Sequence, residues 1–225
     1  MNVLITREPD KVKKFASLLK QAGHCPFSLP MIECVPVDAD IKGYFDHGVF
    51  TSLNAVKYFE PYRKNVTFGQ ITAVGSATKK ALEDAGYKVD LMPDEFSAEG
   101  LKKLFSGMDI KGLSFLLAGA ETRAGDFHEW LKVNGCDADV VTIYRTEQIK
   151  RTKEEIDGFL KDNRIDVITF ASPSAVKAFF ACADTDITLV AIGPTTEKEI
   201  KKHGHSCHTP DEYTLEGMIK IINNL

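Results

Sequence analysis

Three segments recur about half a chain length further on, and this repetition limits the possible folds more than any other feature. The second copies follow in the same order, at offsets of 120, 118 and 117 residues. The pairs are 50–57 (FTSLNAVK) with 170–177 (FASPSAVK), 73–78 (AVGSAT) with 191–196 (AIGPTT), and 93–100 (PDEFSAEG) with 210–217 (PDEYTLEG). A fainter match pairs Phe15, Leu19 and Gly23 with Phe127, Leu131 and Gly135. The chain is therefore predicted to contain a duplicated pair of modules, in the order A, B, A, B.

Short apolar runs alternate with amphipathic stretches that end at glycine, which is the pattern of β-α units that form parallel sheets. One helix is predicted at residues 10–22, because Val12, Phe15 and Leu19 share one face and Gly23 ends it. The predicted strands are residues 3–6, 49–52, 71–74, 114–118, 140–143, 167–171 and 189–192. With the repeat, this order predicts two similar α/β domains made by internal duplication, each with a parallel sheet flanked by helices.

Charge and cysteine content restrict the partners and the compartment. The 225 residues suffice for two small domains, since domains commonly have about 100 to 150 residues. A formal net charge of -4 without a basic face argues against a nucleic-acid partner. No run approaches the roughly 20 apolar residues of a membrane span, and the N-terminus lacks a signal-peptide core. Five cysteines without a Cys-x-x-Cys spacing indicate thiols in the cytoplasm.

Small polar residues follow the predicted strands in the repeated segments, at the sheet edge where open parallel sheets bind ligands. One turn contains Thr51, Ser52 and Asn54, and its repeat contains Ser172 and Ser174. Either these side chains cap the following helices or they bind a ligand.

A second pair of turns places a glycine and hydroxyls at a helix start. Its residues are Gly75 with Thr78, and Gly193 with Thr195 and Thr196. Free backbone N–H groups at these helix starts favour an anionic ligand. Ser97 and Thr214 are predicted N-caps, with Glu99 and Glu216 in the first helical turn.

The positions of Arg123 and Tyr144 in the sequence each allow a structural and a functional interpretation. Arg123 lies in a loop after a predicted strand, where a guanidinium either stays in solvent or binds a carboxylate through two hydrogen bonds. Tyr144 ends an apolar strand at a proposed domain joint, where packing alone is sufficient reason for a tyrosine.

Residues 203–208 (HGHSCH) include zinc-type ligands, but the repeat argues against a metal site. The equivalent segment 85–90 (AGYKVD) has no such set, so the run is predicted to be a turn that enters a strand. Neither a Gly-x-Gly-x-x-Gly nor a P-loop motif is present. No metal or other cofactor is therefore expected, which disfavours a cofactor-dependent reductase or transferase.

The ordered set of motifs resembles the uroporphyrinogen-III synthase family of tetrapyrrole biosynthesis, over almost the whole chain. The matching residues are 4–7 (LITR), 50–52 (FTS), 54–56 (NAV), 73–75 (AVG), Thr78, 144–146 (YRT), Phe170, 172–176 (SPSAV) and 191–196 (AIGPTT). Leu53 stands where many members have proline, and Asn54 where some have a basic residue.

The resemblance implies which modules share a domain. Residues 1–35 plus 149–225 would form one discontinuous domain, and residues 38–146 would form the other. Two extended connectors, near residues 33–40 and 144–152, would link them and let their separation vary. The working site is expected in the cleft between the two domains.

The resemblance also implies a reaction of porphyrin and heme biosynthesis. Linear hydroxymethylbilane would lose water and close, through an azafulvene cation and a spiro intermediate, to a macrocycle with its ring D inverted. Tyr144 is then the candidate for assisting hydroxide departure. The polar turns, Arg7 and Arg123 are the candidate substrate-binding residues.

The same resemblance implies a monomer, and transient contact with the upstream hydroxymethylbilane synthase is a further expectation. The alternative function is a non-catalytic, two-lobed protein that closes on a small molecule. Its periplasmic version would need a signal peptide, and a cytoplasmic sensor would need an output domain.

Overall fold

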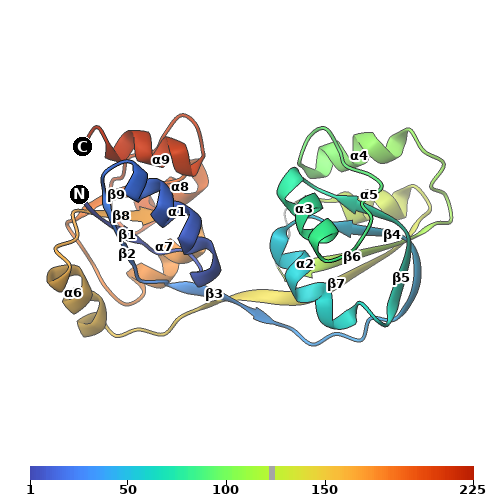
Figure 1. Ribbon diagram of the computed structural model, residues 1–225, viewed down its shortest axis with the longest axis horizontal. Helices are drawn as coiled ribbons and strands as arrows, with labels where there is room; N and C mark the ends of the chain where they lie inside the picture. The colour runs from blue at the N-terminus through green and yellow to red at the C-terminus, as the bar shows by residue number, and fades with distance from the viewer. Residues whose placement is uncertain (122–124) are drawn as a thin grey trace. The chain divides into compact units, whose positions relative to one another are not determined.

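A computed structural model describes residues 1–121 and 125–225 (Figure 1). The chain divides into two compact units, one of Met1–Cys34 with Thr146–Leu225 and one of Val35–Arg145. Both crossings between the units lie inside strands, in β3 (Ile32–Pro36) and in β7 (Asp137–Gln148). Each unit is an α/β unit with a parallel-stranded sheet flanked by helices, as the sequence predicts.

The first unit has a four-stranded sheet with the order β2-β1-β8-β9. Its strands are β1 (Asn2–Ile5), β2 (Cys25–Ser28), β8 (Val167–Phe170) and β9 (Thr188–Ala191), and each neighbouring pair is parallel. Thr6 and Thr169 link the two central strands, because each hydroxyl donates to a backbone carbonyl of the other strand at 2.8 and 2.6 Å. Because all four strands are parallel, their carboxyl ends lie at one edge of the sheet.

Alternation along these strands places helices on both faces of the sheet. Val3 and Ile5 pack with α1 (Pro9–Gln21) and α9 (Leu215–Ile222), whereas Leu4 packs with α6 (Lys153–Asp162), α7 (Pro173–Phe180) and α8 (Pro194–Lys202). Fully burying one such aliphatic side chain is worth about 1.5 to 3 kcal/mol, so these faces stabilise the unit.

The second unit has a five-stranded sheet with the order β3-β7-β6-β4-β5. The pairs formed by β4 (Gly43–Phe50), β5 (Val66–Ala73), β6 (Ser114–Ala120) and β7 are parallel. Backbone hydrogen bonds join Val37 N to Ile143 O and Ile149 N to Met31 O, so residue numbers rise on one strand as they fall on the other. The edge strand β3 therefore runs against β7, as edge strands of parallel sheets often do.

Helices also cover both faces of this sheet. Phe105 and Leu131, from α4 (Ala98–Ser106) and α5 (Phe127–Val133), pack with Val49 and Phe115. The neighbouring Phe50 points to the opposite face, where its ring lies 5.2 Å from Phe59 at the end of α2 (Leu53–Phe59). A short 3-10 helix (Glu60–Tyr62) and α3 (Ser76–Asp84) complete this part of the unit.

Segments related by the sequence repeat adopt the same local structure. Ser52 and Ser172 both cap a helix by accepting the N–H of Ala55 or Ala175, at 3.1 and 3.3 Å. Ser97 and Thr214 are N-caps as predicted, and Pro173 occupies a first helical turn. Each of the seven predicted strands overlaps an observed strand, but β2 and β3 are additional.

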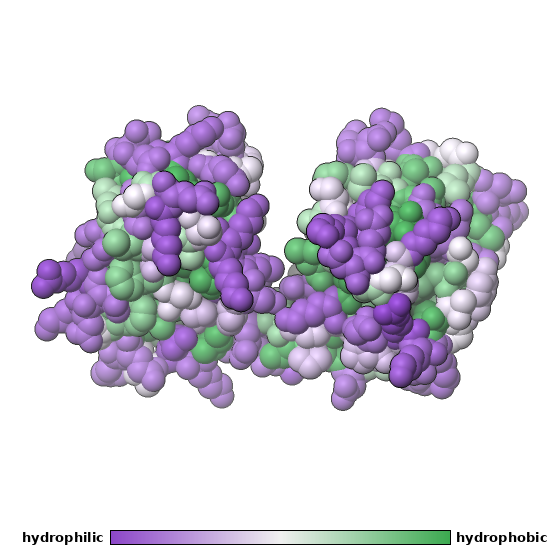
Figure 2. Space-filling model, viewed as in Figure 1, coloured by the Kyte–Doolittle hydropathy of each residue, from purple (hydrophilic) through white to green (hydrophobic). Residues whose placement is uncertain are grey.

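The surface carries both polar and apolar residues. On the face shown in Figure 2, hydrophilic residues cover most of each unit, and smaller hydrophobic areas lie between them. Within residues 1–121 and 125–225, no helix has both the length and the apolar character required to cross a membrane.

Candidate active site

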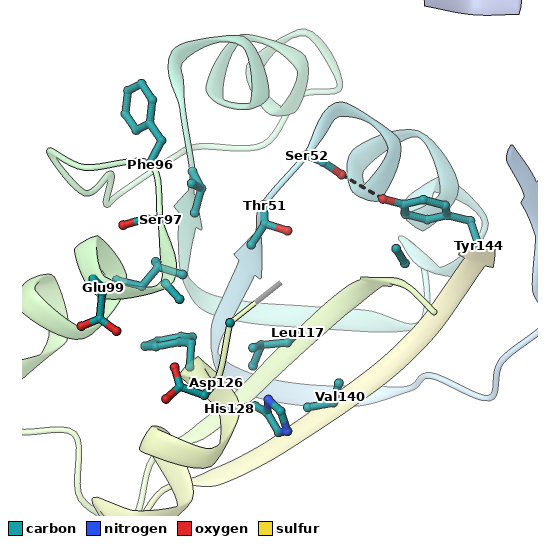
Figure 3. A pocket seen from close by; sticks show the side chains of 16 residues that line it. Thr51, Ser52, Phe96, Ser97, Glu99, Leu117, Asp126, His128, Val140 and Tyr144 are labelled. Carbon is teal, nitrogen blue, oxygen red and sulfur yellow. Dashed lines mark hydrogen bonds between the residues drawn. The ribbon is translucent and has the colours of Figure 1, made fainter. Parts of the chain in front are cut away.

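The second unit contains a pocket of about 630 Å³ at the carboxyl ends of its strands. Its walls come from the turn after β4, the start of α4, the start of α5, and β7 (Figure 3). The polar residues that line it are Thr51, Ser52, Ser97, Glu99, Asp126, His128 and Tyr144. In Figure 3 the pair Ser52 and Tyr144 lies on one side, with Ser97, Glu99 and Asp126 on the other.

Tyr144 reaches the pocket through an irregularity in β7. Gly119 pairs with Thr142, but Ala120 pairs with Tyr144, so the register shifts by one residue at this point. A β-bulge of this kind re-aims the side chains of the bulged strand. Ile143 and Tyr144 are consecutive, yet both are buried, with exposed fractions of 1% and 7%. The Glu121 N–H donates to the Tyr144 carbonyl at 3.0 Å and fixes the backbone there.

Two residues hold the Tyr144 side chain: Ser52, which is the N-cap of α2, and Tyr58, which lies on α2. Its hydroxyl oxygen lies 3.2 Å from Ser52 Oγ, and either oxygen is able to donate. Its ring stacks on Tyr58 with a centroid distance of 5.2 Å and an interplanar angle of 22°. The hydroxyl is thus held at the pocket wall, where it is able to donate a proton or a hydrogen bond to a bound molecule.

Two carboxylates at the pocket share one lysine. Lys102 Nζ lies 2.6 Å from an Asp126 oxygen and 2.8 Å from a Glu99 oxygen. The hydrogen bond to Asp126, and then the one to Glu99, raise the pKa of Lys102, and the same lysine lowers the pKa of Asp126. Lys102 therefore offsets negative charge on this side of the pocket.

The first unit gathers a second set of polar residues at its own carboxyl edge. Because β1, β8 and β9 are neighbours, Arg7, Ser172 and Gly193 follow adjacent strands. Ser174 and Thr195 are exposed near the starts of α7 and α8. Thr196 is only 2% exposed, and its repeat partner Thr78 on α3 is only 4% exposed.

Arg7 is the most unusual residue of this edge. Its Nε is buried without a hydrogen-bond partner among the described residues. Burial lowers the pKa of Arg7, while the neighbouring Glu8 opposes this shift. A guanidinium in this condition is suited to an anionic ligand, because a carboxylate would satisfy the buried donor.

A family model described as uroporphyrinogen-III synthase HemD matches residues 13–220. The chain belongs to the uroporphyrinogen-III synthase family. It is 32% identical to a Methanocaldococcus jannaschii protein whose name marks it as a candidate uroporphyrinogen-III synthase, over 100% of this chain and 99% of the relative. It is 27% identical to the uroporphyrinogen-III synthase of Chlorobaculum parvum, over 94% of this chain and 93% of that protein.

Solved structures of this family have the same fold. The crystal structure of uroporphyrinogen-III synthetase from Helicobacter pylori has a TM-score of 0.68 at 17% identity and covers 99% of this chain and 98% of its own. A mutant uroporphyrinogen III synthase from Thermus thermophilus has a TM-score of 0.53 at 14% identity, over 100% and 98%. At these identities the likeness shows the two-domain α/β fold.

The structure of this uroporphyrinogen-III synthase family member brings some predicted site residues together. Thr51, Ser52 and Tyr144 line one pocket, and Gly75 starts α3 in the same unit with a φ of 94°. Asn54 is 9% exposed and lies within the first turn of α2. Arg123 lies outside the described residues.

The sequence did not point to Asp126 and His128, which line the pocket, or to Lys102, which contacts Asp126. Asp126 is the N-cap of α5, His128 lies in the first turn of that helix, and Lys102 is on α4. The available signal was the start of a helix in the connection after β6, because that edge of a parallel sheet binds ligands. No sequence signal pointed to Lys102, because its ion pair with Asp126 joins residues that are distant in sequence.

The histidines of residues 203–208 have other contacts in this family member. His203 and His205 stack on Phe180 with centroid distances of 5.0 and 4.6 Å, and His205 Nε2 lies 2.7 Å from Asp184. In the described part of the chain, no group of three or more His, Cys, Asp or Glu residues is arranged to hold a metal.

Proposed function

We propose that the protein converts hydroxymethylbilane into uroporphyrinogen III, with loss of one water and inversion of ring D. The observation that carries this proposal is the position of the Tyr144 hydroxyl, which is 3.2 Å from Ser52 Oγ at the wall of a 630 Å³ pocket. In a chain of this family, such a hydroxyl suits the first step, in which the terminal C–O bond of the substrate breaks.

Tyr144 has the role of proton donor in this scheme. As the C–O bond breaks, the electron pair of the pyrrole nitrogen forms an azafulvene cation, and the departing oxygen takes the Tyr144 proton and leaves as water. The substituted carbon of ring D attacks the azafulvene and gives a spiro intermediate. The bond from this carbon to the bridge with ring C then breaks, and the bridge carbon closes again on the other α-carbon of ring D, so ring D is inverted. Loss of a ring proton then restores the pyrrole and returns a proton to Tyr144.

Ser52 has the role of orienting that hydroxyl. Its Oγ accepts the N–H of Ala55, so its own proton is free for another acceptor. Donation from Ser52 to the Tyr144 oxygen leaves the Tyr144 proton directed at the substrate. Ser52 is therefore a positioning residue, because it acts through Tyr144.

The substrate carboxylates are assigned to the polar strand ends. In the second unit the candidates are Thr51, Asn54, Gly75, Thr78 and Arg123, because the one hydroxyl proton of Ser52 is already donated to Tyr144. In the first unit they are Arg7, Ser172, Ser174, Gly193, Thr195 and Thr196. The Nε of Arg7, which has no hydrogen-bond partner among residues 1–121 and 125–225, supports its assignment. Holding the two reacting ends in place lowers the barrier to the productive closure, because the entropy cost of bringing them together is met on binding, and such positioning is worth several kcal/mol.

In this proposal the enzyme is a hydro-lyase that needs no cofactor. It acts as a monomer in the cytoplasm and makes transient contact with the upstream hydroxymethylbilane synthase. Five free thiols support the cytoplasm, because disulfides form in oxidising compartments.

The decisive experiment supplies hydroxymethylbilane, made enzymatically, and separates the products by isomer. The expected product is the type III isomer, whereas a reaction without the protein gives the type I isomer. Only type I product in the presence of folded protein would contradict the proposal. Binding of tetrapyrrole without a change of isomer would instead support the non-catalytic binding protein.

A further inference from the structure

Two exposed aromatic side chains occupy equivalent positions of the sequence repeat. Phe96 and Tyr213 are each 59% exposed, and only Tyr44 is another exposed aromatic residue in the described part of the chain. A single exposed ring is common on protein surfaces and needs no explanation. Exposure at both copies of one repeated segment is different, because each unit presents a ring at the same place in its fold.

The local role expected for these residues does not account for their exposure. Each precedes an N-cap, Ser97 or Thr214, and a hydrophobic residue there commonly packs against the fourth residue of the helix. Those fourth residues, Leu101 and Met218, are only 3% and 0% exposed. The rings are therefore left largely in solvent although a buried apolar partner begins the adjacent helix.

The same tight turn holds both rings. The Ser97 N–H donates to the Glu95 carbonyl at 2.9 Å, and the Thr214 N–H donates to the Glu212 carbonyl at 2.7 Å. A Cβ at Gly100 or Gly217 would meet that carbonyl oxygen at 1.9 or 2.1 Å. Each turn thus depends on a glycine, which lets the backbone close tightly beside the ring.

Each ring also lies against the glycine that begins another helix at the ligand-binding edge. A Cβ on Gly193 would be 3.2 Å from Cγ of Tyr213, and one on Gly75 would be 3.7 Å from Cδ2 of Phe96. Gly193 has a φ of -176°, an extended conformation open to any residue. A side chain at position 193 would therefore require the Tyr213 ring to shift by a few tenths of an ångström.

The surroundings of the rings identify the kind of occupant. Phe96 lines the 630 Å³ pocket that also contains Tyr144, and Figure 3 shows it at the edge of that pocket, next to Ser97. Ser76 directly follows Gly75, Thr195 is two residues after Gly193, and both are exposed. A flat aromatic ring with an acidic side chain matches this combination, because the ring stacks and the carboxylate accepts hydrogen bonds.

We propose that Phe96 and Tyr213 are tetrapyrrole-binding residues, and that each stacks on a pyrrole ring bound at the carboxyl edge of its own unit. This inference rests on the proposed function and extends it to two residues outside the polar turns. Stacking forms in the ground state as well as in the transition state, so it acts mainly on KM.

The test measures KM for hydroxymethylbilane, and Kd for uroporphyrinogen III under anaerobic conditions, in Phe96→Ala and Tyr213→Ala. Loss of a stacking aromatic commonly weakens binding about fivefold or more. We expect both KM and Kd to rise by about that factor, with kcat changed little. The variants Phe96→Tyr and Tyr213→Phe keep an aromatic ring and should retain wild-type KM.

Tyr44→Ala is the matched control, because Tyr44 is 60% exposed near the amino end of β4, at the opposite edge of the sheet. Its KM should stay at the wild-type value. Wild-type KM and Kd in folded Phe96→Ala and Tyr213→Ala would overturn the inference, and would leave a protein partner as the reason for the exposed rings. That result is distinct from failure of the proposed function, in which the wild-type protein makes no type III isomer.

Discussion

The hydroxyl oxygens of Ser52 and Tyr144 lie 3.2 Å apart, and Ser52 Oγ also accepts the Ala55 N–H at 3.1 Å. The residue that caps α2 is therefore also the partner of the candidate proton donor. Because an N-cap has a fixed backbone geometry, the position of the Tyr144 hydroxyl is coupled to the start of a helix. Substitution of Ser52 should therefore lower both stability and kcat, whereas removal of the Tyr144 hydroxyl should lower mainly kcat.

Tyr144→Phe removes the candidate proton donor and keeps the ring that stacks on Tyr58. Losing a general acid commonly costs about 10²-fold or more in rate, but water in the pocket is able to replace part of its function. We expect kcat to fall by roughly tenfold or more, with KM changed less, in steady-state kinetics. A wild-type kcat in a variant with an unchanged thermal melt would return Tyr144 to a packing role.

Ser52→Ala should lower both stability and rate. Removing an N-cap costs about 1 kcal/mol, and loss of one neutral hydrogen bond to Tyr144 should reduce kcat by roughly 2- to 10-fold. Thr152→Ala is the control, because Thr152 caps α6 of the first unit by accepting the Glu155 N–H at 3.2 Å and does not line the pocket. Its stability should fall similarly while its kcat stays constant. Equal rates in both variants would contradict the positioning role of Ser52.

Lys102→Gln should raise KM without a comparable loss of kcat. The substitution leaves Glu99 and Asp126 without the cation that lies 2.8 and 2.6 Å from them, so the pocket becomes more negative toward an anionic substrate. Lys102→Arg keeps the charge and should restore KM. The rise should shrink at high ionic strength, because salt screens exposed charges. A KM independent of both charge and salt would exclude this electrostatic role.

His47 should make the stability of the second unit depend on pH. It is 3% exposed between Phe105 and Phe115, its Nδ1 lacks a partner among the described residues, and burial lowers its pKa against the opposing effect of Asp46 and Asp90. Between the folded and unfolded pKa values the unfolded chain binds the extra proton. The free energy of unfolding therefore falls as pH decreases from about 6.5 toward the folded pKa.

Urea denaturation of wild type and His47→Leu at several pH values between about 7 and 5.5 would measure this contribution, within the range in which histidine titrates. The wild type should lose more stability than the variant over that range. Parallel pH profiles would show that His47 does not titrate on unfolding.

The sequence predicted the elements whose signals are local. The repeat located the caps at Ser52, Ser97, Ser172 and Thr214, because a capping residue contacts backbone only a few residues away. It missed β2, in which Pro26 argues against a strand. Proline is tolerated there because β2 is an edge strand, and edge position is a property of the assembled sheet.

The candidate site was predictable only in part for the same reason. Thr51 and Ser52 were found because they follow a strand, whereas β4 begins at Gly43, earlier than predicted, since His47 and Gly48 interrupt its apolar pattern. The bulge that sets Tyr144 opposite Ala120 depends on how β6 and β7 pair. Pairing between strands is not encoded in the local pattern of either one, so this orientation appeared only in the structure.

Two glycines of the first unit have opposite effects on its stability. A Cβ at Gly217 would lie 2.1 Å from the Glu212 carbonyl oxygen, whereas a Cβ at Gly158, within α6, would meet nothing within 4 Å. Gly217→Ala should therefore lower the free energy of unfolding by about 1 to 3 kcal/mol, through a forced backbone shift. Gly158→Ala should raise it by about 0.5 to 1 kcal/mol, because alanine restricts the unfolded chain and favours the helix. Urea denaturation of both variants measures the two changes in the free energy of unfolding, and both glycines belong to the same unit. A Gly217→Ala variant as stable as wild type would mean that the turn before α9 relaxes freely, and the fixed placement of Tyr213 would then lose its structural basis.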